Sequence, residues 1–490
     1  MISQRRVKIV ATAGPSLSTK ESLKSAVEAG LNVVRLNFSH GTHEDHLRTI
    51  NWVRELSREL GSPLTLLQDL QGPKIRVTKF KEGSVVLNSG QNVMLVPGLS
   101  LGDSQNLGID FLKVAQSVKQ GAKILLDDGL IELVVVAVRG EKVSCQVIAG
   151  GVLKDRKGVN IPGAYLPIEC LTEKDLKDLD FGLAQSVDYV ALSFARRGDD
   201  IIRLRGLIDK KRPETRIIAK IEMLEALENL KEIIELSDGI MVARGDLAVE
   251  AGQERLPGIQ KNIIKMCNEF GKPVITATQM LESMVTKPSP TRAEITDVAN
   301  AVLDGSDALM ISAETASGAH PSKCIKVMND IIVEVEKDSD YYHIDYDIGG
   351  NFLAYADSIS ASACLSARKL DAKAIICLST SGKTAVRIST YRPKAHIIAV
   401  SEVDEALNRL ALVWGARSLK ISPYSDSEEA FAEIEASLLK YDVVKPGDTV
   451  IFTLGMPVKS KSKTNSLKIL TISDRGVKPL PPSELPLGFR

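Results

Sequence analysis

Short apolar runs alternate with longer amphipathic segments along most of the chain. A parallel strand that is buried on both faces gives such a run, and strands alternating with helices indicate βαβ units. Eight runs match the number of strands in a (β/α)₈ TIM barrel, which is the fold class we predict for the main domain. They are Lys8–Ala13, Val33–Asn37, Leu64–Asp69, Tyr189–Phe194, Ile217–Glu222, Gly239–Arg244, Val274–Gln279 and Ala308–Glu314.

Between the third and fourth runs the pattern changes to period two, with many valines and turn glycines. We expect two antiparallel hairpins there, in VVLNSGQNVMLV and in LIELVVVAVRGEKVSCQVIAGG. Such an insertion at the catalytic end of a barrel predicts a β-barrel-like lid, with hinges at Gly72-Pro73 and Pro162-Gly163. The predicted boundaries are 1–71 and 168–338 for the barrel and 72–167 for the lid.

A smaller unit is expected after the barrel. Residues 339–350 are polar and rich in Tyr and Asp, which indicates a linker. Residues 351–475 combine a helical segment at Ala354–Lys369 with short apolar runs, which predicts an open-sheet α/β domain. Residues 476–490 contain four prolines and predict an extended tail without regular structure.

Charged residues interrupt one strand in a way that points to chemistry. Lys220 and Glu222 are two residues apart in the run RIIAKIE, so both side chains should point to the same side of the strand. Burying both charges is costly unless polar groups meet them, and a structural ion pair is one interpretation. The next strand ends at Asp246, however, and two carboxylates at adjacent strand ends can hold Mg²⁺ beside a phosphate-bearing substrate. The sequence therefore predicts a metal-binding Glu beside a catalytic Lys.

Composition narrows the possible partners. The 490 residues include 62 Lys or Arg and 62 Asp or Glu. This balance gives no support for a nucleic-acid or membrane partner, and no apolar run reaches the length of about 18 residues that a membrane helix needs. Six cysteines without CxxC spacing are typical of reduced thiols in a cytoplasmic protein, at positions 145, 170, 267, 324, 364 and 377.

Several longer motifs resemble the signatures of the pyruvate kinase family. They occur in the family's order from about Lys8 to Ile472 and are NVVRLNFSHG, QDLQGPKIRV, AKIE, MVARGDLAVE, ITATQMLESM and MISAETASG. The resemblance implies transfer of a phosphoryl group from phosphoenolpyruvate to ADP, giving pyruvate and ATP in the last step of glycolysis. It also implies a Mg²⁺ requirement, with Mn²⁺ as a possible substitute, and assembly as a homotetramer.

The resemblance assigns roles to individual residues. Mg²⁺ would be held by Glu222 and Asp246. The substrate would contact Arg35, Lys220, Gly245, Asp246 and Thr278. Catalysis would involve Lys220, Arg35 and Arg76, with Thr278, Ser312 and Glu314 as candidates for delivering a proton to the enolate. The nucleotide would contact Pro15, Asn37, His40, Arg76 and Lys157. For a single Arg or Thr among these, an interior hydrogen bond is the alternative interpretation.

A monovalent-cation pocket is also implied, in an altered form. Many family members have Glu in GPEIR, where this chain has Lys74. The expected cation ligands Asn37, Ser39, Asp69 and Leu70 remain as a vestigial pocket, and the ammonium of Lys74 would supply the missing positive charge. We therefore expect that K⁺ is not required.

Two loops suggest regulation and a lid contact. Ser379, Thr380, Ser381, Gly382 and Thr384 lie in STSGKT, after a strand and before a helix expected at Ala385–Tyr391, and would hold a phosphorylated effector such as a sugar phosphate. The loop Gly455–Asn465, with Lys459, Lys461 and Lys463, would face it, unless these are ordinary solvated lysines. Asp127-Asp128-Gly129 predicts a type I′-like turn in the lid or a group that acts when the lid closes.

Two other functions remain as alternatives. One is a different Mg²⁺-dependent barrel enzyme that handles pyruvate enolates, such as an aldolase or a phosphoenolpyruvate mutase-like protein. Those enzymes lack the lid insertion and the Lys157 stretch. The other is a metabolite sensor without activity, which would be expected to have lost Lys220, Glu222, Asp246 or Thr278. None of these four is lost here.

Overall fold

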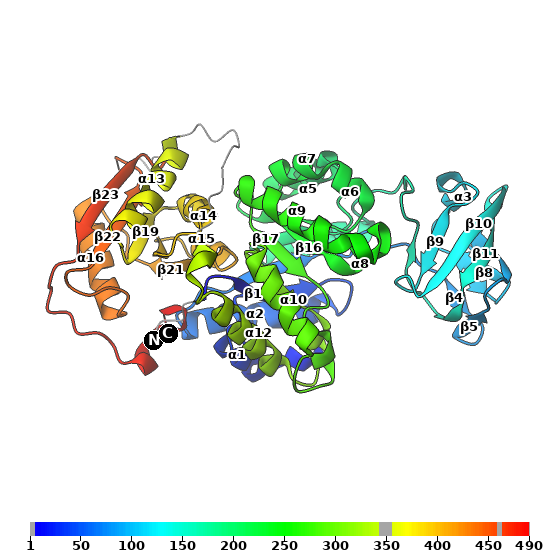
Figure 1. Ribbon diagram of the computed structural model, residues 1–490, viewed down its shortest axis with the longest axis horizontal. Helices are drawn as coiled ribbons and strands as arrows, with labels where there is room; N and C mark the ends of the chain where they lie inside the picture. The colour runs from blue at the N-terminus through cyan, green and yellow to red at the C-terminus, as the bar shows by residue number, and fades with distance from the viewer. Residues whose placement is uncertain (1–4, 343–354, 458–462, 490) are drawn as a thin grey trace.

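A computed structural model describes residues 5–342, 355–457 and 463–489, and places a closed parallel barrel at its centre (Figure 1). The strands follow one another around the barrel in the order β1-β2-β3-β14-β15-β16-β17-β18, and β18 closes onto β1. This confirms the predicted (β/α)₈ fold. The strands are β1 Lys8–Thr12, β2 Val33–Asn37, β3 Thr65–Asp69, β14 Tyr189–Leu192, β15 Arg216–Ile221, β16 Gly239–Ala243, β17 Val274–Ala277 and β18 Ala308–Ile311.

Several strands end earlier than the sequence predicts. The run Ala308–Glu314, for example, is a strand only to Ile311, and the run Val274–Gln279 only to Ala277. The polar residues that follow have left the sheet and lie at the carboxyl end of the barrel. The helices around the barrel are α1 Lys20–Glu28, α2 His43–Glu59, α4 Glu173–Ala184, α5 Gly198–Asp209, α6 Leu224–Glu228, α7 Leu230–Leu236, α8 Arg244–Ala251, α9 Leu256–Glu269, α10 Arg292–Leu303, α11 Ala313–Ala316 and α12 Pro321–Val335.

A separate β unit follows β3, at the far right of Figure 1. The predicted hairpin of β10 and β11 is present, but the other predicted hairpin is wrong. Its two strands do not pair: β5 pairs with β12, and β6 lies between β11 and β8. Gly150, next to β12, allows the pairing of β12 with β5. A Cβ at this position would lie 2.2 Å from the carbonyl oxygen of Leu87, so only glycine lets the two segments approach so closely. The strands are β4 Lys79–Phe80, β5 Ser84–Leu87, β6 Asn92–Pro97, β7 Leu101–Gly102, β8 Asn106–Ile109, β9 Lys123–Leu126, β10 Ile131–Arg139, β11 Lys142–Ala149, β12 Gly151–Lys154 and β13 Val159–Asn160, with the short helix α3 at Val114–Ser117.

The C-terminal part forms an open sheet in the order β21-β20-β19-β22-β23, with only β23 antiparallel. This confirms the predicted α/β class. The helix after STSGKT begins at Lys383 and ends at Thr390, earlier than predicted at both ends. Linker residues 343–350 and the loop lysines Lys459 and Lys461 lie outside the described residues. The elements are α13 Tyr355–Lys369, β19 Ala374–Leu378, α14 Lys383–Thr390, β20 His396–Ser401, α15 Asp404–Leu410, β21 Ala416–Lys420, α16 Ser427–Lys440, β22 Thr449–Leu454 and β23 Ser466–Thr471.

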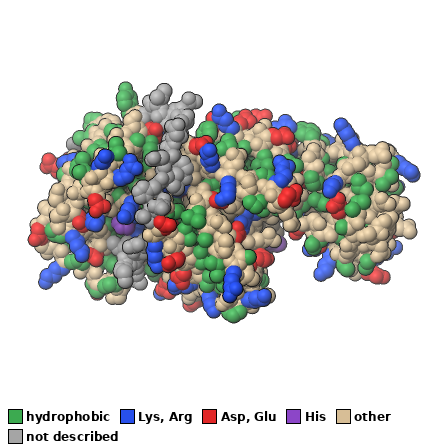
Figure 2. All heavy atoms as spheres, viewed as in Figure 1, with side chains coloured by type: hydrophobic (Ala, Val, Ile, Leu, Met, Phe, Trp, Pro, Cys, Tyr) green, Lys and Arg blue, Asp and Glu red, His purple; other side chains and the backbone are tan. Residues whose placement is uncertain are grey.

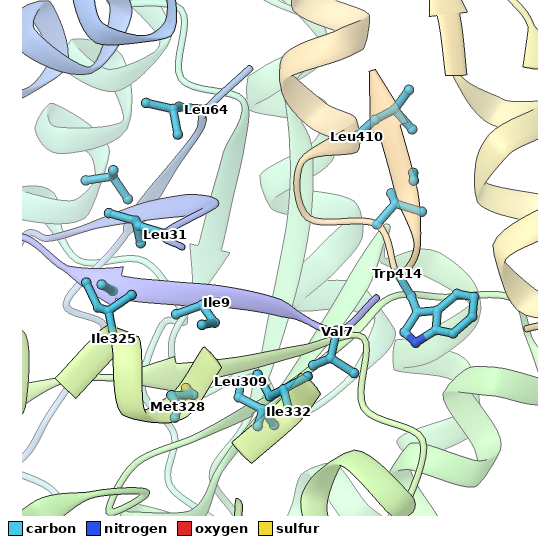
Figure 3. Packing of buried hydrophobic residues seen from close by; sticks show 14 of the residues in the cluster. Val7, Ile9, Leu31, Leu64, Leu309, Ile325, Met328, Ile332, Leu410 and Trp414 are labelled. Atoms are coloured by element: carbon cyan, nitrogen blue, oxygen red, sulfur yellow. The ribbon is translucent and has the colours of Figure 1, made fainter. Parts of the chain in front are cut away.

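The C-terminal sheet docks on the amino-terminal end of the barrel. Leu412, in the turn before β21, is fully buried within the cluster of side chains that fills the barrel interior. Next to it, Leu410 and Trp414 join a cluster that continues through Val7 and Ile332 of the barrel (Figure 3). Removing apolar surface from water stabilises a structure by about 25 cal/mol per Å². A continuous apolar cluster that spans two domains therefore connects them strongly.

The tail crosses back to the barrel. Phe489 is buried against Tyr441 in the C-terminal domain, and the backbone N–H of Leu487 donates to the carbonyl of Leu60 in the barrel. The tail also contains two single 3₁₀ turns, η6 at Pro482–Glu484 and η7 at Leu487–Phe489, which corrects the prediction that it has no regular structure. The tail therefore contacts both the barrel and the C-terminal domain and connects them.

The surface in Figure 2 carries basic and acidic side chains side by side, without a large area of one sign on that face. Among the described residues, no helix has both the length and the apolar character needed to cross a bilayer.

Candidate active site

Lys220 is the centre of the charged group at the carboxyl end of the barrel. Its Nζ lies 2.9 Å from Oε1 of Glu222 and 3.3 Å from Oδ1 of Asp69, and it donates to the hydroxyl of Ser193 over 2.8 Å. Burial alone would lower the pKa of Lys220, but the charges of Asp69 and Glu222 outweigh it and raise the pKa. The ammonium is therefore held charged and in a fixed position.

Arg35 of β2 shares the carboxylate of Asp69 with Lys220. Its Nε lies 2.6 Å from Oδ2 of Asp69, and its Nη1 donates to Thr12 Oγ1. Burial alone would raise the pKa of Asp69, but Lys220 and Arg35 outweigh it and lower the pKa. Asp69 is thus an anion that holds two cations at the mouth of the barrel.

The two carboxylates expected to hold Mg²⁺ fit that role. Glu222 is 2% exposed, and its Oε2 accepts a hydrogen bond of 2.6 Å from the backbone N–H of Phe194. The pKa of Glu222 is raised, first by burial, which outweighs the opposing charge of Lys220, and further by the charge of Asp246. Two carboxylates that repel each other at a partly buried site suit a divalent cation, because the cation offsets their repulsion and carboxylate oxygens are its preferred ligands.

Lys74 contacts one of these carboxylates. Its Nζ lies 3.0 Å from Oδ1 of Asp246 and 3.9 Å from Oδ1 of Asp128 in the lid. The other residues of the expected monovalent-cation pocket have different partners: Asn37 Oδ1 accepts from the N–H of Ser39, and Leu70 is buried with its carbonyl accepting from Ser193. Within the described residues, the ion pairs of Lys74 are with Asp246 and Asp128.

Thr278 is held in an unusual backbone conformation. Its φ is 70° and that of Gln279 is 53°, a left-handed pair that non-glycine residues adopt only under constraint. The buried Arg244 provides the constraint, because its guanidinium donates to the carbonyl of Thr278 over 2.7 Å and pairs with Asp297. The Thr278 hydroxyl in turn accepts from the N–H of Gly245 over 2.9 Å. Gly245 and Thr278 therefore form one unit at the start of α8.

Three of the five expected nucleotide contacts line one cavity of about 670 Å³. They are Pro15, Asn37 and His40, and Arg35 and Ser312 also face this cavity. The volume lies within the usual range of about 300–1,000 Å³ for small-molecule sites. His46 of α2 packs against the loop between β2 and α2. Its ring stacks on Phe38, and its Nε2 lies 3.0 Å from the carbonyl oxygen of His40.

The other two expected nucleotide contacts are in the lid and do not line this cavity. Arg76 donates to the carbonyl of Arg156 over 2.9 Å, and Lys157 pairs with Asp127 at 2.8 Å. Asp127 and Asp128 both have positive φ between β9 and β10, which agrees with the predicted I′-like turn. In this structure the two lid cations therefore contact other lid residues.

Of the proton-delivery candidates, Ser312 and Glu314 have contrasting surroundings. The hydroxyl of Ser312 has no hydrogen-bond partner among the described residues. Glu314 is fully buried and its carboxylate accepts from the backbone N–H groups of Leu281 and Ser312. Glu314 therefore connects the two loops that follow β17 and β18.

The expected effector residues gather at the start of α14. Gly382 has a φ of 76° and its N–H donates to Ser379 Oγ over 3.2 Å. Thr384 is 2% exposed and its hydroxyl contacts that of Thr464. Thr380 and Ser381 are partly or fully exposed in the same loop.

Sequence reasoning missed two residues of the site. Ser193 holds Lys220 and donates to the carbonyl of Leu70 over 2.6 Å, and Arg244 holds the turn at Thr278. A signal for Ser193 exists, because it is a polar residue that follows directly on the buried strand β14. Arg244 carries the same signal, because it directly follows the buried strand β16, but its contacts with a loop more than 30 residues away could not be predicted from it.

A buried lysine that faces carboxylates at the mouth of a (β/α)₈ barrel, beside a cavity of about 670 Å³, fits a barrel enzyme that transfers phosphoryl groups. The family model for the pyruvate kinase barrel domain matches residues 4–325, and the model for the pyruvate kinase alpha/beta domain matches residues 357–470. The chain belongs to the pyruvate kinase family. Membership sets aside the aldolase and mutase-like alternatives.

Individual relatives agree over nearly the whole chain. A pyruvate kinase of Geobacillus stearothermophilus is 42% identical over 475 residues, which are 96% of this chain and 81% of the relative. A pyruvate kinase of Clostridium perfringens is 41% identical, covering 95% of this chain and 99% of that one. The crystal structure of a pyruvate kinase from Cryptosporidium parvum superposes with a TM-score of 0.91 at 36% identity, covering 96% of both chains.

Proposed function

We propose that this chain transfers the phosphoryl group of phosphoenolpyruvate to ADP, giving pyruvate and ATP. The observation that carries the proposal is the position of Lys220, which is buried yet charged between Asp69 and Glu222. A fixed cation at this place stabilises negative charge on the phosphoryl group during its transfer without reorganisation.

The neighbouring residues supply the remaining interactions. Arg35 contributes a guanidinium that can bind a phosphate in a forked manner, and the N–H groups at the start of α8 suit the substrate carboxylate. The hydroxyls of Thr278 and Ser312 would take part in delivering a proton to the enolate product. Mg²⁺ bound by Glu222 and Asp246 would neutralise charge on the phosphate and the enolate oxygen. Arg76 and Lys157 of the lid would reach the nucleotide together with Pro15, Asn37 and His40.

The experiment for this proposal is a steady-state assay of ATP formation from ADP and phosphoenolpyruvate, in which pyruvate is reduced by lactate dehydrogenase. We expect turnover with Mg²⁺ and none after chelation of divalent ions. Binding of phosphoenolpyruvate and ADP without ATP formation would instead support the sensor alternative.

Three finer features belong to the same proposal. Activity does not need K⁺, because Lys74 carries a covalently attached positive charge. A phosphorylated metabolite, most simply a sugar phosphate, activates the enzyme through residues 379–384. The active assembly is a homotetramer in the cytoplasm. The ion pair between Lys74 and Asp246 supports the first feature, and the turn of residues 379–382 at the start of α14 supports the second. The predictions below test these two.

A further inference from the structure

Helix α4 is bonded to two parts of the chain that are expected to hold the same nucleotide. One part is the nucleotide loop, which we define as residues 38–42 between β2 and α2. His40 of this loop and Asn37 just before it line the cavity of about 670 Å³. The other part is the lid, which carries the expected nucleotide contacts Arg76 and Lys157. The first turns of α4, the helix that follows the lid in sequence, contact the loop on one side and the lid hinge on the other.

Lys174, in the first turn of α4, holds the nucleotide loop by its backbone. Its Nζ donates to the carbonyl of Phe38 over 2.6 Å and to Oδ2 of Asp178 over 2.5 Å. The side chain of Lys174 is 50% exposed, but two short hydrogen bonds from its ammonium hold it in one position. The main chain of the loop is therefore tied to α4.

Asp178 is the buried anchor of this contact. It is 4% exposed, and its Oδ1 lies 2.8 Å from Nε2 of His43 at the start of α2. Because a buried carboxylate is costly without partners, Lys174 on one oxygen and His43 on the other make this position tolerable. The backbone carbonyl of Asp178 accepts from Nε2 of Gln68 on β3 over 2.6 Å. One carboxylate, itself fixed to the barrel sheet, thus holds both ends of the nucleotide loop.

Stacked rings fill the space between the loop and α4. Phe38 is 2% exposed, and its ring stacks on His46 with the centroids 4.1 Å apart and the planes at 17°. The ring of His43 stacks on Phe181 of α4 with the centroids 4.3 Å apart and the planes at 15°. Aromatic side chains packed in this way have little freedom to move. The stacking and the ion pairs therefore give the loop one position relative to α4.

The same part of α4 binds the lid hinge. Asp175 is fully buried, and its Oδ1 accepts a hydrogen bond of 3.1 Å from the backbone N–H of Gly72, where the lid begins. Its Oδ2 accepts from the backbone N–H of Thr172 over 2.9 Å and from the hydroxyl of Thr172 over 2.6 Å, which caps the start of α4. Residues 174–178 thus connect the nucleotide loop with the lid hinge.

We propose that Lys174 and Asp178 are positioning residues for ADP, which act through α4 by fixing the nucleotide loop relative to the lid hinge. The inference rests on the proposed function, in which groups near the loop and groups of the lid bind one nucleotide. Contacts from two separate parts act together only when their spacing matches the ligand, and a displacement of about 1 Å can cost a factor of about 100 in rate.

The arrangement predicts a selective effect. The expected contacts of phosphoenolpyruvate lie on barrel strands, at the start of α8 and at Thr278, and not in the nucleotide loop. Loss of the anchor on α4 should therefore weaken the binding of ADP and leave that of phosphoenolpyruvate nearly unchanged. A residue that merely stabilises the fold would affect both substrates alike.

The test is isothermal titration calorimetry with ADP and Mg²⁺ in the absence of phosphoenolpyruvate, together with the KM values for both substrates. For Lys174→Met we expect the dissociation constant and the KM for ADP to rise about fivefold or more, since the loop is no longer fixed. The KM for phosphoenolpyruvate should stay within about twofold, which marks a loss of ADP binding only. Lys177→Met removes an exposed lysine from the same helix and should match the wild type.

Two further variants complete the test. Lys174→Arg keeps the charge and can donate to both acceptors, so it should recover most of the ADP affinity. Asp178→Asn removes the negative charge that holds the ammonium, so it should repeat the selective loss and decides the matter if Lys174→Met does not fold.

The proposal is overturned if folded Lys174→Met and Asp178→Asn bind ADP as tightly as the wild type. A control variant that loses as much affinity, or KM values that rise together for both substrates, would also overturn it. Because calorimetry does not depend on turnover, a wild type that binds ADP but forms no ATP would contradict the proposed function alone.

Discussion

The ammonium of Lys74 lies 3.0 Å from Oδ1 of Asp246. This contact connects the chain at the lid hinge with a carboxylate that we assign to Mg²⁺, across 172 residues of sequence. The side chain of Lys74 packs against Gly158 of the lid, where a Cβ would lie 3.0 Å from Lys74 Cε. A positive charge is thus built into the wall of the site, where it can offset the carboxylates before an anionic substrate arrives.

This relationship predicts that K⁺ does not stimulate the enzyme. In tetramethylammonium buffer we expect initial rates within about twofold with and without KCl at constant ionic strength, because the positive charge is already present. Lys74→Glu should lower the rate without K⁺ by about tenfold or more and make it respond to K⁺. Lys79→Glu, an exposed lid position, is the matched control and should behave like the wild type. Strong stimulation of the wild type by K⁺ would refute the assignment.

Removal of the Lys220 charge should nearly abolish phosphoryl transfer. For Lys220→Met we expect kcat to fall by about 10²–10³ or more, as for the loss of other groups that stabilise transition-state charge. Circular dichroism and Mn²⁺ binding followed by electron paramagnetic resonance should remain close to wild type. Lys231→Met on α7 provides an exposed control with the same substitution. A kcat within tenfold of the wild type would remove Lys220 from the mechanism.

The effector loop predicts activation by a phosphorylated metabolite. We expect phosphoenolpyruvate saturation curves to shift to lower concentration when a sugar phosphate is added, since the ligand need only bind the active state better than the inactive one. Thr384→Ala should abolish the shift and leave the basal kcat unchanged, because the residue lies in the C-terminal domain. The panel should include nucleotide monophosphates. An unchanged shift in Thr384→Ala, or no shift with any compound, contradicts the assignment.

Glu250 predicts a pH-dependent contribution to stability. It is 6% exposed on α8 and accepts a hydrogen bond of 3.4 Å from Asn160 of the lid, and burial raises its pKa to about 7. A carboxyl with a raised pKa in the folded state contributes stability below its unfolded pKa of 4.5 and loses it as the pH rises through about 7.

Glu250→Gln should therefore become more stable relative to the wild type between pH 5 and pH 8, by up to about 3 kcal/mol. The measurement is urea unfolding at several pH values, with Glu254→Gln as the exposed control. A constant difference between the Glu250→Gln and wild-type free energies of unfolding across this range would show that the carboxyl titrates normally.

The sequence by itself determined the barrel and the chemistry of its mouth. Alternation of apolar runs and helices is a local property, so all eight strands could be predicted from it, with errors only at their ends. Lys220 and Glu222 could be predicted to lie together because two residues on one strand share a side. The distance of 2.9 Å between Lys220 Nζ and Glu222 Oε1 agrees with that prediction.

Tertiary structure decided what depends on pairing between distant segments. The period-two pattern identified lid strands but not their partners, and β5 and β6 joined different sheets although a turn connects them. Ser193 and Arg244 became part of the site only when folding brought Lys220 and Thr278 to them. Arg5 and Lys8 of the barrel lie in one cavity with Arg417 only because the C-terminal strand β21 docks on the barrel floor. Burial there removes the water that would otherwise solvate each charge.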